Sequence, residues 1–565
     1  MSRRFTAGAV ATATALVMVA TVPTGAATAA PTRSTEYTVV SADGVSADAA
    51  LAAITAAGGT VVSRTDGVGL FQVVSDRSDF AKRAADSAVL VGAAERKAIG
   101  HAPKARLEKV EREELQAAAK TAGKNNRRGP VKADPLDDKL WGLEMLRATA
   151  ARAVEPGDRR VTVGVMDTGL DASNPDLAAN FNWALSKNFA KDLPDVDGPC
   201  EVASCVDAVG TDDNGHGTHV AGTIGAAANG VGLSGVAPKV SLVELKTGQD
   251  SGYFFLDSVV NALVYAADKG IDVVNMSFYV DPWAFNCLNN PADSAEEQAA
   301  QQATIKGMRR ALDYAHARGV TLVGALGNNH EDLGAPRTDS SSPNYGGTPH
   351  DRPIDNSTCW DLPVEGPHVI GVSSLGPSGK KSDFSNYGVE QISVAAPGGW
   401  ARDGFGTPSY LAAGNRILSS YPVKVLKEEG LVDADGNIVP GNEGVVFKEC
   451  QTDGRCGYYT YLQGTSMASP HAAGVASLIV SRFGRPDFRR GGLTLSPDLV
   501  EHQLLRTAAE HACPEPRLQT YTNEGRSAEF NALCEGDENF NGFYGYGIVD
   551  AYAAVTSPLQ PWKRP

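Results

Sequence analysis

The hydrophobic positions of residues 36–99 alternate between short apolar runs and two helical stretches. The helical stretch over 47–57 is followed by Gly58-Gly59, a pair that commonly ends a helix. The resulting order is β-α-β-β-α-β, which predicts a small α+β domain of the ferredoxin-like type. We expect its strands at 36–40, 60–62, 70–74 and 89–91, and its helices at 47–57 and 80–87.

Beyond residue 134, buried apolar runs alternate with longer helical patterns, and no internal repeat is evident. This order predicts an α/β fold, a doubly wound and mostly parallel sheet with helices on both faces. We expect strands at 161–167, 240–245, 271–275, 321–328, 368–372 and 391–395, with helices after 216, over 256–268, over 295–318 and from 466.

Composition and charge divide the chain near the same point. Its 565 residues have no Trp before Trp141 and no Cys before Cys200. Residues 1–133 hold 18 Lys+Arg and 12 Asp+Glu, net +6, so the remainder is 33 minus 54, net −21. An acidic second part argues against nucleic acid or an anionic membrane surface as a partner.

The N-terminus has the pattern of a signal peptide over residues 1–29. Arg3 and Arg4 precede an apolar stretch over 7–22 and a small-residue cleavage site ending at Ala29. No later run reaches the ~18 apolar residues of a spanning helix. We expect a secreted, extracellular protein without a membrane anchor in its mature form. We also expect two domains, at 30–102 and 134–565, joined by a charged linker at 103–133.

The eight cysteines all follow residue 199, and no C-x-x-C pair occurs. In an exported chain an even number of cysteines favours disulfides over a metal site. Closeness in sequence favours Cys200–Cys205 and Cys450–Cys456. For the remaining four we expect 287–359 and 513–534.

A serine lies where a helix is expected to begin, in the segment Gly464-Thr465-Ser466-Met467-Ala468-Ser469-Pro470-His471. Proline is tolerated in the first turn of a helix, and apolar residues continue with helical spacing to Ile479. Ser466 is therefore expected at a helix N-terminus, where backbone N–H groups stabilise developing negative charge. The alternative is an ordinary serine N-cap.

Two further segments carry reactive side chains. Asp167 ends a buried apolar strand, and catalytic groups gather at the carboxyl ends of such strands. His216 lies in Asn214-Gly215-His216-Gly217-Thr218-His219, a glycine-rich helix entry. A histidine alone in such a run is more often structural or a metal ligand. Together with Ser466, the segments supply a nucleophile, a base and a carboxylate that orients the base.

The strings DTG, HGTHVAG and GTSMASPH, in this order, resemble the subtilisin-like serine proteases. The resemblance implies that Asp167 orients the imidazole, His216 is the general base and then the acid, and Ser466 is the nucleophile; His219 has no chemical role. It implies a serine endopeptidase that hydrolyses protein or peptide substrates through an acyl-enzyme and needs no cofactor for the chemistry.

The same resemblance assigns residues beyond the triad. Asn328 follows a buried strand in a segment similar to the family's A-A-G-N, which makes it the side-chain donor to the oxyanion, with the Ser466 backbone N–H as its partner; the alternative is a turn Asn. Ser277, Phe278 and Tyr279 resemble the strand that pairs with extended substrate, although relatives usually have Gly at the position of Tyr279. The alternative is an ordinary buried strand.

A structural calcium ion is a further expectation of the resemblance. Asp176 and Asn229 occupy positions that match family calcium ligands, and oxygen donors suit that ion. The alternative for both residues is turn chemistry.

The domain at 30–102 resembles the family's inhibitory propeptide, which implies a zymogen with a maturation site in 103–133. The alternative is an independent binding module. Insertions at 192–213 and 398–462 lie beside the catalytic segments, where they either wall the cleft or stabilise the surface. Two functions compete with the endopeptidase: a tripeptidyl-type exopeptidase of the same fold and a catalytically inactive extracellular binding protein.

Overall fold

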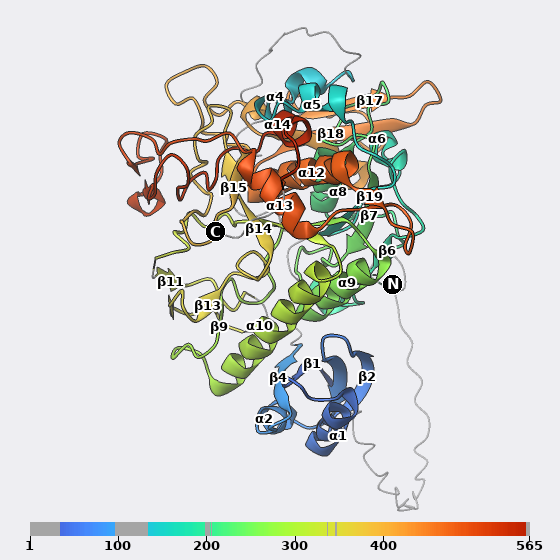
Figure 1. The fold of residues 1–565 in the computed structure, drawn as a ribbon, viewed down its shortest axis with the longest axis vertical. Coiled ribbons are helices and arrows are strands. Elements are labelled where there is room, and N and C mark those ends of the chain that lie inside the picture. Colours follow the sequence, from blue (N-terminus) through green and yellow to red (C-terminus); the bar gives the residue numbers. More distant parts are fainter. Residues whose placement is uncertain are drawn as a thin grey trace, which may run out of the picture.

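A computed structural model describes residues 34–96, 134–197, 204, 206–335, 337–344 and 347–560. The predicted signal peptide, the linker at 103–133 and the Cys200–Cys205 pair lie outside these residues. Figure 1 shows a small N-terminal domain, in blue, against a larger body built on one central sheet. None of the helices described is both long and apolar enough to cross a membrane.

The small domain has the predicted β-α-β-β-α-β order, and its sheet runs β2-β3-β1-β4 with antiparallel neighbours. The first helix matches its expected bounds because both ends are capped: the Ser46 hydroxyl accepts from the Ala49 N–H at 3.2 Å, and Gly58 adopts φ 96°. The elements are β1 Thr35–Ser41, α1 Ala47–Ala57, β2 Thr60–Thr65, β3 Leu70–Ser75, α2 Phe80–Ala85 and β4 Leu90–Glu95.

The body is organised around a seven-stranded sheet in the order β15-β14-β10-β8-β5-β7-β6, in which every neighbouring pair is parallel. The predicted doubly wound α/β fold is confirmed. Its strands are β5 Thr162–Asp167, β6 Lys187–Asn188, β7 Ser241–Lys246, β8 Val273–Met276, β10 Thr321–Ala325, β14 Val369–Leu375 and β15 Val394–Pro397.

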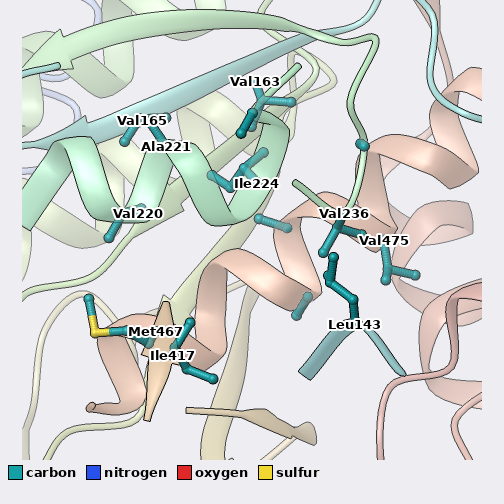
Figure 2. Close-up of a cluster of buried hydrophobic side chains, with 14 of the residues drawn as sticks. Leu143, Val163, Val165, Val220, Ala221, Ile224, Val236, Ile417, Met467 and Val475 are labelled. Carbon is teal, nitrogen blue, oxygen red and sulfur yellow. The ribbon is translucent and has the colours of Figure 1, made fainter. Parts of the chain in front are cut away.

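Successive side chains of β5 face two different cores. Val163 and Val165 pack with α8 (His216–Gly225) and α12 (Thr465–Phe483), as Figure 2 shows, whereas Met166 packs with α9 (Leu256–Lys269) and α10 (Ala295–His316). A fully buried parallel strand therefore reads as a continuous apolar run although its residues alternate between faces. In Figure 1, α9 and α10 lie on the side of the sheet that faces the small domain.

Shorter elements complete the body. The helices are α4 Trp141–Met145, α5 Ala148–Val154, α6 Pro175–Ala178, α7 Pro194–Asp197, α11 Val423–Glu428, α13 Pro497–Arg506 and α14 Ala551–Thr556, with 3-10 turns at Asp137–Lys139, Ala413–Asn415 and Ala528–Phe530. The two-stranded pairs are β9 Asn286–Cys287 with β13 Cys359–Trp360, β11 Arg337–Asp339 with β12 Arg352–Ile354, β19 Arg485–Pro486 with β20 Leu493–Thr494, and β21 Leu518–Gln519 with β22 Ala532–Leu533.

The insertion at 398–462 forms a second small sheet. Its strands β16 (Ile417–Tyr421), β18 (Cys456–Leu462) and β17 (Val446–Cys450) are antiparallel neighbours in that order. The Ser419 hydroxyl donates to the His219 carbonyl of α8 at 2.7 Å, and β18 ends three residues before α12. This insertion is therefore built into the packing around α8 and α12.

The small domain packs on α9 and α10 through its sheet. The Thr65 hydroxyl donates to the Asn261 amide oxygen at 2.6 Å. Asp43 accepts from Arg310 at 2.7 Å and also pairs with Lys306. The two domains thus share an interface on the face of the body opposite α8 and α12 (Figure 1), in which these polar contacts accompany apolar packing of Val40, Val68 and Leu70 in the cluster of α9 and α10.

Disulfides join Cys287 to Cys359, Cys450 to Cys456, and Cys513 to Cys534, as predicted. They close chain segments of very different length, since the paired residues are 72, 6 and 21 positions apart.

We expect the Cys287→Ser/Cys359→Ser variant to lose more stability than Cys450→Ser/Cys456→Ser. Chain-entropy arguments give about 4 kcal/mol for a loop of the first length and about 2 kcal/mol for the second. Chemical denaturation of both variants beside the parent protein measures the difference. Equal losses, or a larger loss for the short loop, would contradict the expectation.

Candidate active site

The side chains of Asp167 and His216 meet at the carboxyl end of β5. Asp167 is fully buried, and its Oδ1 lies 2.8 Å from His216 Nδ1 and accepts from the Thr168 N–H at 2.8 Å. Because an ionised carboxylate only accepts hydrogen bonds, Nδ1 carries the imidazole proton, which leaves Nε2 as the basic nitrogen.

Two glycines allow this approach of α8 to β5. Gly217 lies so close to the turn after β5 that a Cβ there would collide with the Gly169 carbonyl. Gly215, which precedes His216, has φ 100°, and a side chain at this position would collide with the Tyr421 ring. The glycines around His216 are thus explained by close packing and backbone conformation.

Asp212, which the sequence analysis missed, fixes the loop that enters α8. Its carboxylate accepts from the Thr218 N–H at 2.9 Å and hydroxyl at 2.6 Å, from the Thr168 hydroxyl at 3.0 Å and from the Gly215 N–H at 2.9 Å. It thereby ties the α8 entry to the residue that follows Asp167. The run Asp212-Asp213-Asn214-Gly215, typical of Asx turns, was the available signal.

Ser466 is the second residue of α12, so its predicted place at a helix N-terminus is confirmed. The serine is 4% exposed, and its Oγ donates to the Ser277 carbonyl at 3.3 Å. Helix α12 packs against α8, so the helix that carries Ser466 in its first turn is a direct neighbour of the helix that begins at His216.

Pro470 differs from its expected place in the first turn. It is the sixth residue of α12, and a proline there leaves the carbonyl of Ser466, four residues earlier, without its helical donor. The Ser277 hydroxyl supplies that donor at 3.2 Å and accepts from the Ser469 hydroxyl at 2.8 Å. The residue after β8 thus holds the first turns of α12.

Asn328 lies just beyond β10 and contacts the residue before Ser466. Its Oδ1 accepts from the Thr465 N–H at 2.8 Å and the Thr465 hydroxyl at 3.0 Å. These two donors define the amide orientation, so the NH₂ group lies at the end remote from Thr465.

The other two histidines of the motif strings are buried and neutral. Burial lowers the pKa of His219 to about 3 and that of His471 to about 4. His219 Nε2 donates to the Ile417 carbonyl at 3.0 Å, and His471 Nδ1 donates to the Met467 carbonyl at 2.8 Å. Neither ring exchanges a proton near neutral pH, which agrees with the absence of a chemical role for His219.

The predicted substrate segment continues directly from β8, which ends at Met276. Ser277 contacts Ser466 as described, and the Phe278 ring stacks on Phe254 with centroids 4.1 Å apart and planes at 3°. The Tyr279 hydroxyl accepts from Asn344 Nδ2 at 2.7 Å. All three residues therefore lie along one path that begins at Ser466.

The donor set at Asp176 and Asn229 does not fit a calcium ion between them. The Asn229 amide turns its nitrogen, not its oxygen, toward Asp176 Oδ1 at 3.1 Å. Asp176 Oδ2 accepts from the Tyr459 hydroxyl at 2.8 Å and the Leu233 N–H at 3.0 Å. Protein donors thus satisfy both carboxylate oxygens, and burial raises the pKa of Asp176 to about 7.

A second group of carboxylates, formed by Asp207, Asp213 and Asp250, makes ion pairs with lysine side chains. Lys246 Nζ lies 3.0 Å from Asp207 and 2.7 Å from Asp250, and Lys424 Nζ lies 2.5 Å from Asp213. These ammonium groups supply the charge that a metal ion would bring.

We expect a chelator or added Ca²⁺ to change the melting temperature by less than about 2 °C, since protein donors already occupy both carboxylate oxygens of Asp176. Tyr459→Phe should lower the free energy of unfolding by about 1–3 kcal/mol, because the buried Asp176 carboxylate loses a donor. Calorimetry checks both expectations.

The matched control is Tyr461→Phe on the same strand, whose hydroxyl makes no hydrogen bond to a carboxylate among the described residues. A large drop in melting temperature with chelator would contradict the conclusion that calcium does not bind at Asp176. Equal effects of the two substitutions would contradict the conclusion that the Tyr459 hydroxyl satisfies the Asp176 carboxylate.

Comparison with known proteins agrees with this geometry. Residues 158–547 match the Subtilase family of peptidases. Subtilisin DY of Bacillus licheniformis is 28% identical over 368 residues, covering 65% of this chain and 90% of the relative. The major intracellular serine protease of Bacillus subtilis is 30% identical over 366 residues, covering 65% and 81%.

Solved structures show the same fold. The epidermin leader peptide processing serine protease of Staphylococcus aureus has a TM-score of 0.59 and 20% identity, over 94% of this chain and all of that chain. Fervidolysin from Fervidobacterium pennivorans has a TM-score of 0.55 and 21% identity, over 94% of this chain and 62% of that chain. Since the family match spans most of the body and its relatives are serine proteases, the chain belongs to the subtilase family.

Proposed function

We propose that this protein is a serine endopeptidase that hydrolyses peptide bonds with Asp167, His216 and Ser466. The observation that carries the proposal is the 2.8 Å contact of the buried Asp167 carboxylate with His216 Nδ1, in a chain whose helix α12 carries Ser466 in its first turn. The carboxylate holds the ring in the tautomer that a general base requires.

The reaction follows from these roles. His216 Nε2 takes the Ser466 hydroxyl proton as Oγ bonds to the substrate carbonyl carbon, and the resulting imidazolium is stabilised by Asp167. The same proton then passes to the leaving amine as the peptide C–N bond breaks. Water repeats the sequence on the acyl-enzyme, giving its proton to His216 and releasing the acid and the free Ser466 hydroxyl.

The tetrahedral intermediate needs donors for its oxyanion. The Ser466 backbone N–H lies at the N-terminus of α12, where the peptide dipoles favour negative charge. The Asn328 amide, oriented through Thr465, is the proposed side-chain donor. No metal or other cofactor takes part in this proposal.

Substrate is proposed to bind as an extended strand along Ser277, Phe278 and Tyr279, where backbone hydrogen bonds give affinity. Tyr279 is held by Asn344, so its ring forms a fixed side of a subsite that is open in relatives with Gly at this position. Substrate preference therefore follows this chain's own side chains.

The small N-terminal domain is proposed to be an intramolecular inhibitor, released by cleavage in 103–133 after secretion. Its packing on α9 and α10 supports this role. The protein would then be made as a zymogen and act on protein or peptide substrates outside the cell.

Ser466→Ala should abolish hydrolysis and labelling by a serine-directed covalent inhibitor while the fold is kept, because the nucleophile is lost. Ser477→Ala, on the same helix, is the matched control and should keep both. Digestion of a peptide library, with products identified by mass spectrometry, measures the effect.

The products also separate the alternatives. Internal cleavage supports an endopeptidase, and uniform release of tripeptides from free N-termini supports an exopeptidase. Hydrolysis by purified Ser466→Ala would refute the proposed nucleophile.

Asn328→Ala should lower kcat by about 100- to 1,000-fold with KM nearly unchanged, since the donor acts mainly in the transition state. Thr465→Val, which removes the hydroxyl that donates to Asn328 and accepts from the Gly327 N–H at 3.0 Å but keeps the backbone N–H that orients Asn328, should cost less than about tenfold. Unchanged turnover in Asn328→Ala, measured on a folded sample by steady-state kinetics, would remove Asn328 from the mechanism.

A further inference from the structure

The last described residue of the small domain inserts a cation between the domains. Arg96 follows β4, and its guanidinium lies 2.9 Å from the Asp257 carboxylate in the first turn of α9. The Asp257 side chain is 2% exposed and also pairs with Lys191. Burial acts to raise the pKa of Asp257, but the charges of Arg96 and Lys191 outweigh it and lower the pKa overall.

A cavity of about 90 Å³ surrounds this ion pair at the domain boundary. The body contributes four carboxylates to its lining, Asp257, Asp281, Glu296 and Glu297, together with apolar surface from Phe255, Leu256 and Trp283. Arg96 is the one basic residue among the lining residues described. The cavity is therefore an acidic pocket with an apolar wall, and a guanidinium already lies in it.

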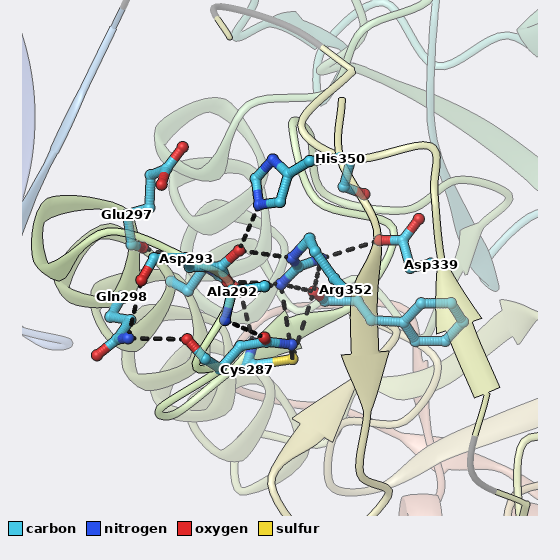
Figure 3. A network of polar contacts seen from close by, with 12 residues as sticks. Cys287, Ala292, Asp293, Glu297, Gln298, Asp339, His350 and Arg352 are labelled. Atoms are coloured by element: carbon cyan, nitrogen blue, oxygen red, sulfur yellow. Dashed lines mark hydrogen bonds and ion pairs between the residues drawn. The ribbon is translucent and has the colours of Figure 1, made fainter. Parts of the chain in front are cut away.

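The wall of this pocket is fixed by a buried network, shown in Figure 3. Arg352, fully buried, donates to Asp293 at 2.8 and 3.0 Å and to Asp339 at 2.9 Å. Its guanidinium also lies 4.5 Å from the centre of the Trp283 ring. Asp281 is held independently, because it accepts from the Phe254 N–H at 2.7 Å. The part of the wall that belongs to the body is thus held by contacts within the body, whereas residues 93–96 of the small domain form another part of the lining.

We propose that, in the processed enzyme, this pocket binds an arginine or lysine side chain of the substrate, with Asp257 as the residue that determines the preference. The inference rests on the proposed peptidase function and on release of the small domain. When Arg96 leaves, Asp257 keeps Lys191 but loses its second cation, and the pocket presents four carboxylates to the substrate.

The structure also indicates which part of a substrate reaches the pocket. Ser277 contacts Ser466, and Asp281, four residues further along, lines the pocket. Four residues span at most about 13 Å, so the basic side chain should lie within about four residues of the cleaved bond. Arg96 follows β4 and precedes the proposed maturation site in 103–133, so a substrate residue that takes its place is expected on the N-terminal side of the cleaved bond.

The test uses enzyme processed from the full chain and peptides that carry Arg, Lys, Ala or Glu at each position before the cleaved bond. We expect Arg or Lys at one position, within about four residues before the bond, to raise kcat/KM by at least about tenfold over Ala. Asp257→Asn should reduce that preference to within about threefold while Ala peptides are still cleaved. Asp313→Asn, the same charge change on α10 outside the pocket, is the matched control and should retain the preference.

Hydrolysis by the parent enzyme with no basic preference at any such position would overturn the inference and leave the proposed function intact. A preference that survives in folded Asp257→Asn would also overturn it. If Asp257→Asn fails to fold, the presence or absence of a basic preference in the parent enzyme alone supports or overturns the inference. Absence of hydrolysis of every peptide by the parent enzyme would refute the proposed function and this inference with it.

Discussion

The Asp167 carboxylate lies fully buried at the end of β5, where it needs hydrogen-bond donors because an unpaired charge there would cost several kcal/mol. The Thr168 N–H and the His216 ring donate hydrogen bonds to the carboxylate, and the bond from His216 requires the first residue of α8 to lie beside the end of β5. Gly217 permits that approach, and Asp212 fixes the loop that leads to it. The site therefore follows from satisfying one buried charge in a parallel sheet.

Much of the framework could be predicted because the signals were local. Helix α1 has a serine cap at one end and a glycine at the other, and the strands of the parallel sheet are continuous apolar runs between turns. The sheet β16-β18-β17 was not predicted. β16 is buried throughout and β18 nearly so, and neither shows the alternation that marks a strand with one exposed face.

Predictions about individual side chains were limited by partners far along the chain. Asp176 and Asn229 are residue types that bind calcium, but Tyr459, 283 positions after Asp176, brings the hydroxyl that satisfies the carboxylate. Pro470 was expected in a first turn because a later proline orphans a carbonyl. The hydroxyl of Ser277, 189 positions before Ser466, removes that penalty. Residue type and spacing alone contain no information about such contacts.

Because β18 and α12 are close in sequence, a contact that stabilises β18 also positions the proposed nucleophile. Tyr459 precedes the proposed nucleophile by seven residues on one continuous stretch, and it ties that stretch to Asp176. Heating that breaks the Tyr459–Asp176 contact would displace the reactive hydroxyl while the parallel sheet remains intact, and a misplacement of about 1 Å is enough to slow such chemistry severely. Thermal inactivation would therefore precede global unfolding, and the working temperature range of the enzyme would be set by one tyrosine anchor.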